Sequence, residues 1–132
     1  MRRLFPGWPI GFDALGRLIA WDLRRVVRYD PVTREIEPLR TETMRLTRNA
    51  HVSPDGRYLV AIPDGLNLHI LDLIDGDRRT IPLEPPRRWS SDPVAFHGDL
   101  AVFEGVDWPT INHAVVSLRD GWVDYVSRTA DG

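Results

Sequence analysis

SPDGRYLVAIPDG, at residues 53–65, is the stretch that decides the fold. It holds one apolar run, Tyr58 to Ile62, between two turns that contain Asp-Gly. Asp-Gly is a preferred sequence for tight hairpin turns, because glycine adopts a positive φ without strain. A short apolar run without polar alternation is typical of a strand that is covered on both faces. The stretch therefore predicts a hairpin strand inside a stack of sheets.

The segment before it repeats this pattern. FDALGRLIA at residues 12–20 overlays VSPDGRYLV at residues 52–60, which sets Gly16 on Gly56 and Leu18-Ile19 on Tyr58-Leu59. VVRYDP at residues 26–31 overlays LHILDL at residues 68–73, which sets Asp30 on Asp72. Self-similarity at a fixed spacing indicates a protein built from repeated supersecondary units.

A third copy follows. HAVVSLRDG at residues 113–121 overlays LHILDLIDG at residues 68–76 and sets Val116-Ser117 on Leu71-Asp72. We therefore expect a single domain, residues 1–132, of three units of about 40–45 residues each. Their approximate bounds are 8–40, 48–84 and 92–127.

Each unit contains four short apolar runs separated by Gly, Asp and Pro, which predicts four strands. The fold class expected is all-β, with three four-stranded antiparallel sheets arranged as propeller-like blades. In the second unit, Leu66, Leu68 and Ile70 would share one sheet face, while Leu71 and Leu73 would lie on the other. Burial of both faces is what stacked blades need.

The two hairpin segments carry a family resemblance. SPDGRYLVAIPDG resembles the first hairpin of WD-repeat and TolB-like β-propeller blades, and VVRYDPVTREIEPL at residues 26–39 resembles the outer half of such a blade. The resemblance implies a half-propeller or partial propeller. Propellers usually have roughly four to eight blades, so with three units we expect a second copy, a partner or irregular segments to cover the ends.

Composition excludes several classes of function. The 132 residues include 17 basic and 19 acidic side chains, so no basic footprint for nucleic acid is present. The absence of Cys excludes disulfide scaffolds, cysteine zinc sites and thiol catalysis. Every basic residue is Arg, which favours a GC-rich bacterial source. No apolar run approaches the about 18 residues of a membrane helix, and Pro6, Gly7 and Pro9 interrupt any signal peptide, so we expect a cytoplasmic protein without a membrane partner.

The chain carries none of the sequence motifs of phosphate loops, dinucleotide folds, HExxH metalloproteases or GxSxG hydrolases. The four His are not spaced as zinc ligands, and the Asp-Gly turns lack the spacing of a calcium loop. The sequence therefore predicts a protein that is not an enzyme, with no catalytic residue, no metal site and no cofactor.

Loops offer the candidates for partner binding. Loops carry function more often than strands do, and Trp and Arg are enriched in binding hot spots. The partner-binding candidates come from the two least regular stretches: Arg87, Arg88, Trp89, Asp107 and Trp108. A second interpretation is that the Pro-rich segment only links two blades and that Trp89 covers their seam. Trp21 and Trp122 are expected to lie in strands and to pack in the core.

The function expected from these observations is a non-enzymatic protein-binding module, such as the immunity or inhibitor protein of a bacterial toxin. A short chain with a binding scaffold suits a dedicated inhibitor, although fold alone does not determine function. The alternative is a ligand-binding or hydrolytic propeller that is completed by homodimerisation. The expected partner is thus a cognate toxin or a second copy of the chain.

Overall fold

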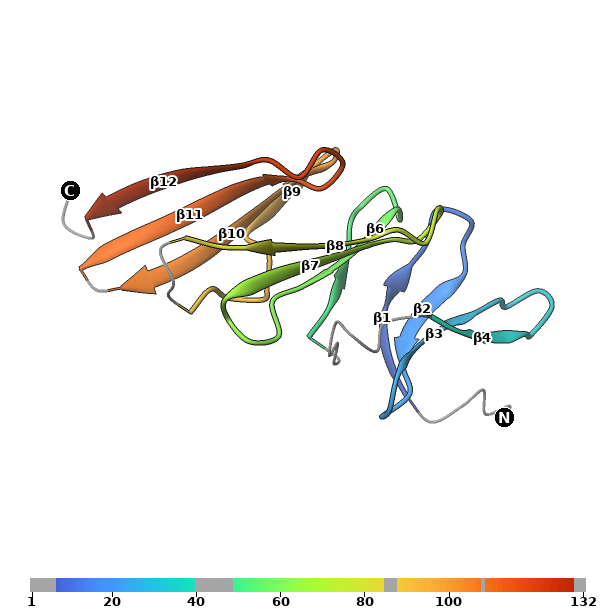
Figure 1. Ribbon diagram of the computed structural model, residues 1–132. Helices are drawn as coiled ribbons and strands as arrows, with labels where there is room; N and C mark the ends of the chain where they lie inside the picture. The colour runs from blue at the N-terminus through green and yellow to red at the C-terminus, as the bar shows by residue number, and fades with distance from the viewer. Residues whose placement is uncertain (1–6, 40–48, 85–87, 108, 130–132) are drawn as a thin grey trace.

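The computed structural model describes residues 7–39, 49–84, 88–107 and 109–129. These residues form three four-stranded antiparallel sheets and no helix, and none of the sheets closes into a barrel. The sheets stand one after another as a stack, with the N-terminal sheet at one end and the C-terminal sheet at the other (Figure 1). The predicted all-β class with three blade-like sheets is confirmed. No helix in the described ranges could cross a membrane.

Each sheet is made of four strands that are consecutive in the chain and neighbours in the sheet. The first sheet contains β1 (Trp8–Phe12), β2 (Leu18–Trp21), β3 (Val26–Tyr29) and β4 (Ile36–Pro38). The second contains β5 (His51–Val52), β6 (Tyr58–Ala61), β7 (Asn67–Asp72) and β8 (Arg78–Pro82). The third contains β9 (Ala95–His97), β10 (Leu100–Asp107), β11 (Thr110–Ser117) and β12 (Val123–Thr129).

The same turn follows the third strand of every sheet. Its first residue is Asp30, Asp72 or Ser117, whose side-chain oxygen accepts a hydrogen bond from a backbone N–H two or three residues further on, at 2.9, 2.9 and 3.0 Å. The backbone carbonyl of that first residue also accepts a hydrogen bond from the residue four positions later. The three positions are therefore equivalent, as the overlay of the sequence units predicts.

The first hairpin departs from that overlay by one residue. Backbone N–H of Asp13 donates to the carbonyl of Arg17, whereas N–H of Ser53 donates to the carbonyl of Tyr58, one residue further on. Ile19 consequently occupies the position of Val60, not that of Leu59, and faces the second sheet.

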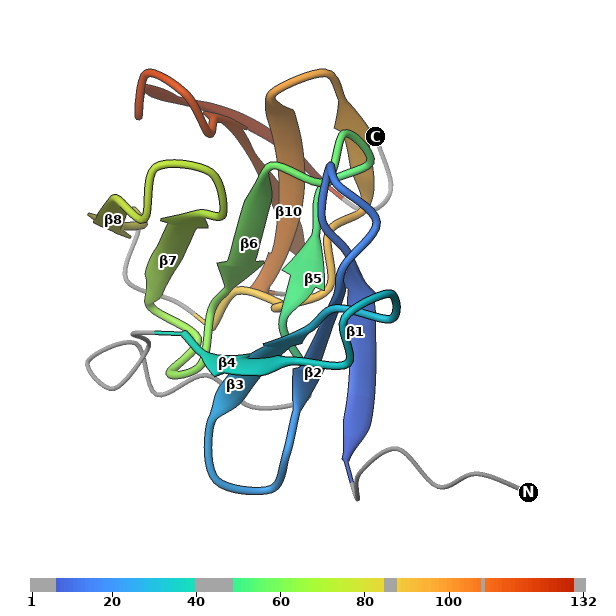
Figure 2. The same ribbon diagram turned by 90° about the vertical axis from the view of Figure 1, so that its right-hand side faces the viewer.

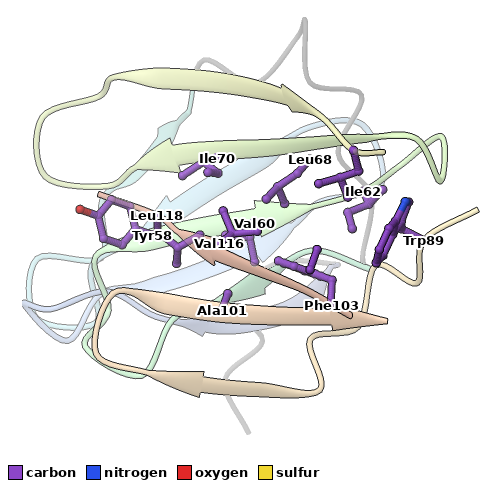
Figure 3. Packing of buried hydrophobic residues seen from close by; sticks show 12 residues of the cluster. Tyr58, Val60, Ile62, Leu68, Ile70, Trp89, Ala101, Phe103, Val116 and Leu118 are labelled. Atoms are coloured by element: carbon purple, nitrogen blue, oxygen red, sulfur yellow. The ribbon is translucent and has the colours of Figure 1, made fainter. Parts of the chain in front are cut away.

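The second sheet lies between the other two and is buried on both faces (Figure 2). One face carries Leu59 and Leu71 against the first sheet, and both side chains are at most 4% exposed. The other face carries Val60 and Ile70 against Phe103 of the third sheet (Figure 3). Burial on both faces explains why β6 lacks polar alternation.

An arginine reinforces the seam between the first and second sheets. Arg28 lies on β3 at the position that Ile70 occupies on β7, and its side chain is only 10% exposed. Its guanidinium donates to the carbonyl of Leu73 at 2.5 Å and pairs with the carboxylate of Asp13 at 3.2 Å. Burial lowers the pKa of Arg28. Arg28 thus joins the first hairpin, through its ion pair with Asp13, to the turn after β7, through its hydrogen bond to Leu73.

Candidate binding surfaces

Trp89 lies in the seam between the second and third sheets. Its side chain is 3% exposed and belongs to the same core cluster as Phe103. The backbone of Trp89 forms an isolated bridge with Gly105, and its ring centroid is 6.0 Å from that of Tyr125. Figure 3 shows the indole at one end of the seam. The position is that of the second interpretation, in which Trp89 covers a seam between blades.

The other four partner-binding candidates are only partly described. Arg88 is exposed beside Gly65, and for Asp107 the structure describes only the backbone, at the end of β10. Arg87 and Trp108 lie outside the described residues. The bridge from Trp89 to Gly105 brings Arg88 to the end of β10 that leads into Asp107. As an interface, the five residues stay a prediction.

The outer face of the third sheet carries a set of apolar side chains that point away from the stack. We call the following residues the outer apolar face: Leu100, Val102, Ile111, Val115 and Val126. Strand alternation places them opposite Ala101, Phe103 and Val116, which point into the seam. Val126 is 57% exposed, and the other four are partly exposed.

The second sheet shows what this face becomes when a neighbour covers it. The pair Val60 and Ile70 on β6 and β7 corresponds to the pair Val102 and Val115 on β10 and β11. Val60 is 0% and Ile70 is 3% exposed, because the third sheet packs against them. Val102 and Val115 remain partly exposed. The outer apolar face is thus a blade face without the neighbour that a blade has inside the stack.

This face also carries ionisable side chains, one pair of them where the covered counterpart is apolar. His113 lies 3.6 Å from Glu104 and occupies the position of Leu68, which is 0% exposed in the second sheet. Asp124 and Arg128 of β12 stand on the same face as Val126. The Glu104–His113 pair therefore lies in the middle of the face, between the Val102–Val115 pair and Ile111. A mixture of apolar and polar area is usual in non-obligate protein interfaces.

The opposite end of the stack is different in character. The side chains on the outer face of the first sheet are apolar along β1, β2, β3 and β4: Phe12, Leu18, Ala20, Val27, Tyr29 and Ile36. Ala20 and Val27 at its centre are each 1% exposed, whereas Phe12 and Ile36 at its margins are 60% and 48% exposed. The third sheet, in contrast, leaves the centre of its outer face accessible.

One contact between histidine and aspartate was not found from the sequence. Nε2 of His51 lies 2.8 Å from the carboxylate of Asp92, which joins β5 to the loop before β9. The neighbouring Ser91 hydroxyl accepts a hydrogen bond from Ile62 N–H and donates to the carbonyl of Asn49. Through these two hydrogen bonds, one accepted and one donated, the hydroxyl holds the loop against the second sheet. Within the described residues, no three His, Asp or Glu side chains are grouped to hold a metal ion.

No protein-family model matches the chain, and the searches of curated proteins and of solved structures also gave no match. The likeness to WD-repeat and TolB-like blades remains a resemblance in short motifs. The sheets themselves support the coarser statement that the fold is all-β and blade-like.

Proposed function

We propose that the chain is a non-enzymatic protein-binding module and that the outer apolar face receives its partner. The observation that carries the proposal is the accessibility of Val102, Val115 and Val126 at a blade face whose counterpart in the second sheet is buried. Apolar area that stays in water favours association, at roughly 25 cal/mol per Å² removed from water.

The charges on this face favour a different protein over a second copy of the chain. Ring closure by two copies would create a seam in which His113 takes the place that Leu68 has between the second and third sheets. Covering Glu104 and His113 with an apolar face would leave both groups without water, which is costly for charged side chains. A partner that offers polar groups opposite this pair avoids that cost.

The size of the face sets how much more the partner must contact. β10 and β11 have eight residues each, so the face is about 26 Å long and, across three strands, about 15 Å wide. The area of the face, the product of these two lengths, is about half of the roughly 800 Å² that each partner buries in a standard interface. The partner therefore also contacts turns at the margin of the third sheet.

The finer proposal is that the partner is a bacterial toxin which the chain inhibits. It rests on the size of the chain, 132 residues, together with a scaffold suited to binding. An inhibitor needs only to cover the active site or binding surface of its partner, and a rigid sheet face does this at little entropic cost.

The proposal is tested by the mass in solution of the purified chain, alone and mixed with the protein encoded by the adjoining gene. We expect 15.1 kDa for the chain alone and one-to-one complex formation in the mixture. A stable dimer of the chain alone would instead support the homodimeric alternative. A chain that stays monomeric in the mixture would refute the toxin-inhibitor proposal.

A further inference from the structure

A cavity of about 420 Å³ opens at the seam between the second and third sheets. It lies at the end of the seam where Tyr58 and Leu118 are found, opposite the end that Trp89 occupies (Figure 3). Tyr58, Ile70 and Leu118 supply its apolar wall, and four arginines and three aspartates supply its polar wall. Its volume is within the range of small-molecule sites.

One arginine of the cavity is fixed in place. The guanidinium of Arg57 donates to the carboxylate of Asp72 at 3.0 and 3.2 Å and lies 5.4 Å above the ring of Tyr58. Asp75 also pairs with Arg57, at 3.4 Å. The Asp72 carboxylate accepts two further backbone N–H groups, so its acceptor capacity is largely used. Arg57 therefore presents an ordered cation beside the ring.

Arg79 reaches from the second sheet across the seam to the third. It lies on β8 in register with Ile70 and so faces the third sheet. There it packs against Gly121, in the turn between β11 and β12, where a Cβ would overlap the guanidinium of Arg79. Glycine at position 121 thus leaves the space that the arginine occupies. Within the described part of the chain, the guanidinium groups of Arg79 and Arg119 have no hydrogen-bond or ion-pair partner.

The charge balance of the lining indicates the kind of ligand. Two of the three aspartates, Asp72 and Asp75, are engaged by Arg57. The guanidinium groups of Arg79 and Arg119 are thus the cations that a carboxylate entering the cavity would meet. Guanidinium groups bind a carboxylate through two parallel N–H donors. Burial raises the pKa of Tyr58, so its hydroxyl remains a hydrogen-bond donor at neutral pH.

We propose that this cavity binds a small organic carboxylate, with the carboxylate between Arg79 and Arg119 and an apolar body against Tyr58, Ile70 and Leu118. The site is separate from the outer apolar face, because its walls belong to the inner seam. The inference is therefore independent of the proposed function. The carboxylate could belong to a free small molecule or to an acidic side chain of another protein, and both present the same group to the arginines.

The test uses the full chain and 3-phenylpropionate as the probe, followed by backbone amide NMR. We expect saturable shifts at Gly121 and Leu118, and none with 3-phenylpropanol, which lacks the charge. Arg79→Met and Arg119→Met should each weaken binding by about tenfold or more, the effect of losing one charge-assisted hydrogen bond. Arg24→Met is the matched control, because Arg24 is exposed in the turn between β2 and β3 and should leave the affinity unchanged.

Three results would overturn the proposal. The first is no shift at about 10 mM probe, at which even a 1 mM site is mostly occupied. The second is binding that neither arginine variant weakens, provided that amide spectra show both variants folded. The third is equal binding of inorganic phosphate, which would indicate an unselective anion site. To separate the two sources, a short peptide ending in Phe-Glu is compared with 3-phenylpropionate: tighter binding of the peptide indicates a protein side chain, and tighter binding of the free acid a small molecule.

Discussion

Replacing Gly56 by Ala tests how closely the first and second sheets approach each other. Gly56 has a φ of +74°, and a Cβ there would lie 2.5 Å from the carbonyl carbon of Asp13 and 2.9 Å from Cα of Ala14. Both atoms belong to the backbone of the first hairpin, which is held by a hydrogen bond from Ala14 N–H to the carbonyl of Gly56. Neither of the two hairpins can move aside without breaking that hydrogen bond.

Gly16 provides the matched control. It occupies the same turn position in the first hairpin, with a φ of +78°, and a Cβ there would meet nothing within 4 Å. Both substitutions carry the cost of a left-handed backbone, about 1–2 kcal/mol. Only Gly56→Ala adds the overlap between sheets, about 1–3 kcal/mol. We therefore expect a loss of about 1–2 kcal/mol for Gly16→Ala and about 2–5 kcal/mol for Gly56→Ala.

Urea unfolding followed by tryptophan fluorescence measures both losses in free energy of unfolding. A chain of this size has roughly 5–15 kcal/mol of stability, so both variants should remain measurable. Equal losses for the two variants would refute the close packing of the first hairpin on the second. A larger loss for Gly16→Ala would refute it as well.

Three further predictions concern single contacts. Gly105→Ala places a Cβ 2.9 Å from the ring of Trp89, so we expect the free energy of unfolding to fall by about 1–3 kcal/mol and amide exchange in β10 to become faster. Unchanged amide exchange would contradict the packing of that ring. Arg28→Ala should cost about 1–3 kcal/mol in urea unfolding, because it removes the hydrogen bond to Leu73 and leaves Asp13 with Arg17 as its arginine partner, whereas Arg24→Ala should change the stability by less than about 0.5 kcal/mol. Asp64 has its pKa lowered to about 2: burial acts to raise it, but hydrogen bonds from Asn67 and Leu66 outweigh burial. The contribution of this carboxylate to stability is therefore complete above the ordinary value of 3.8 and is lost as the pH falls through about 2, so the stability difference between wild type and Asp64→Ala should narrow over that range in unfolding curves.

The sequence predicts the strands and their turns because both depend on local chemistry. Asp30, Asp72 and Ser117 accept hydrogen bonds from the turn that follows each of them, so their equivalence is visible in the residues alone. The one-residue shift in the first hairpin, in contrast, cannot be seen in the residues alone. There the Asp13 carboxylate accepts the N–H groups of Leu15 and Arg17, while Ser53 in the second hairpin receives Tyr58 N–H on its hydroxyl.

Positions that depend on tertiary contacts were harder to predict. The expectation that Trp122 packs in a core strand is wrong, because Trp122 precedes β12 and is 45% exposed. Trp21 is a partly buried neighbour of the core between the first two sheets. The cavity near Arg79 could not be found from the sequence, because it joins β8 to a turn of another sheet through Gly121.

The central claim is that the third sheet presents a face for another protein. Isothermal titration of the chain with the protein encoded by the adjoining gene tests it most directly, using Val126→Arg and Val32→Arg. Val126 lies on the outer apolar face, and Val32 is an 89% exposed residue in the turn between β3 and β4. We predict that Val126→Arg weakens binding by at least about tenfold, a change of about 1.4 kcal/mol, while Val32→Arg leaves it unchanged. Binding that Val126→Arg does not weaken, or no binding by the unmodified chain, would contradict the claim.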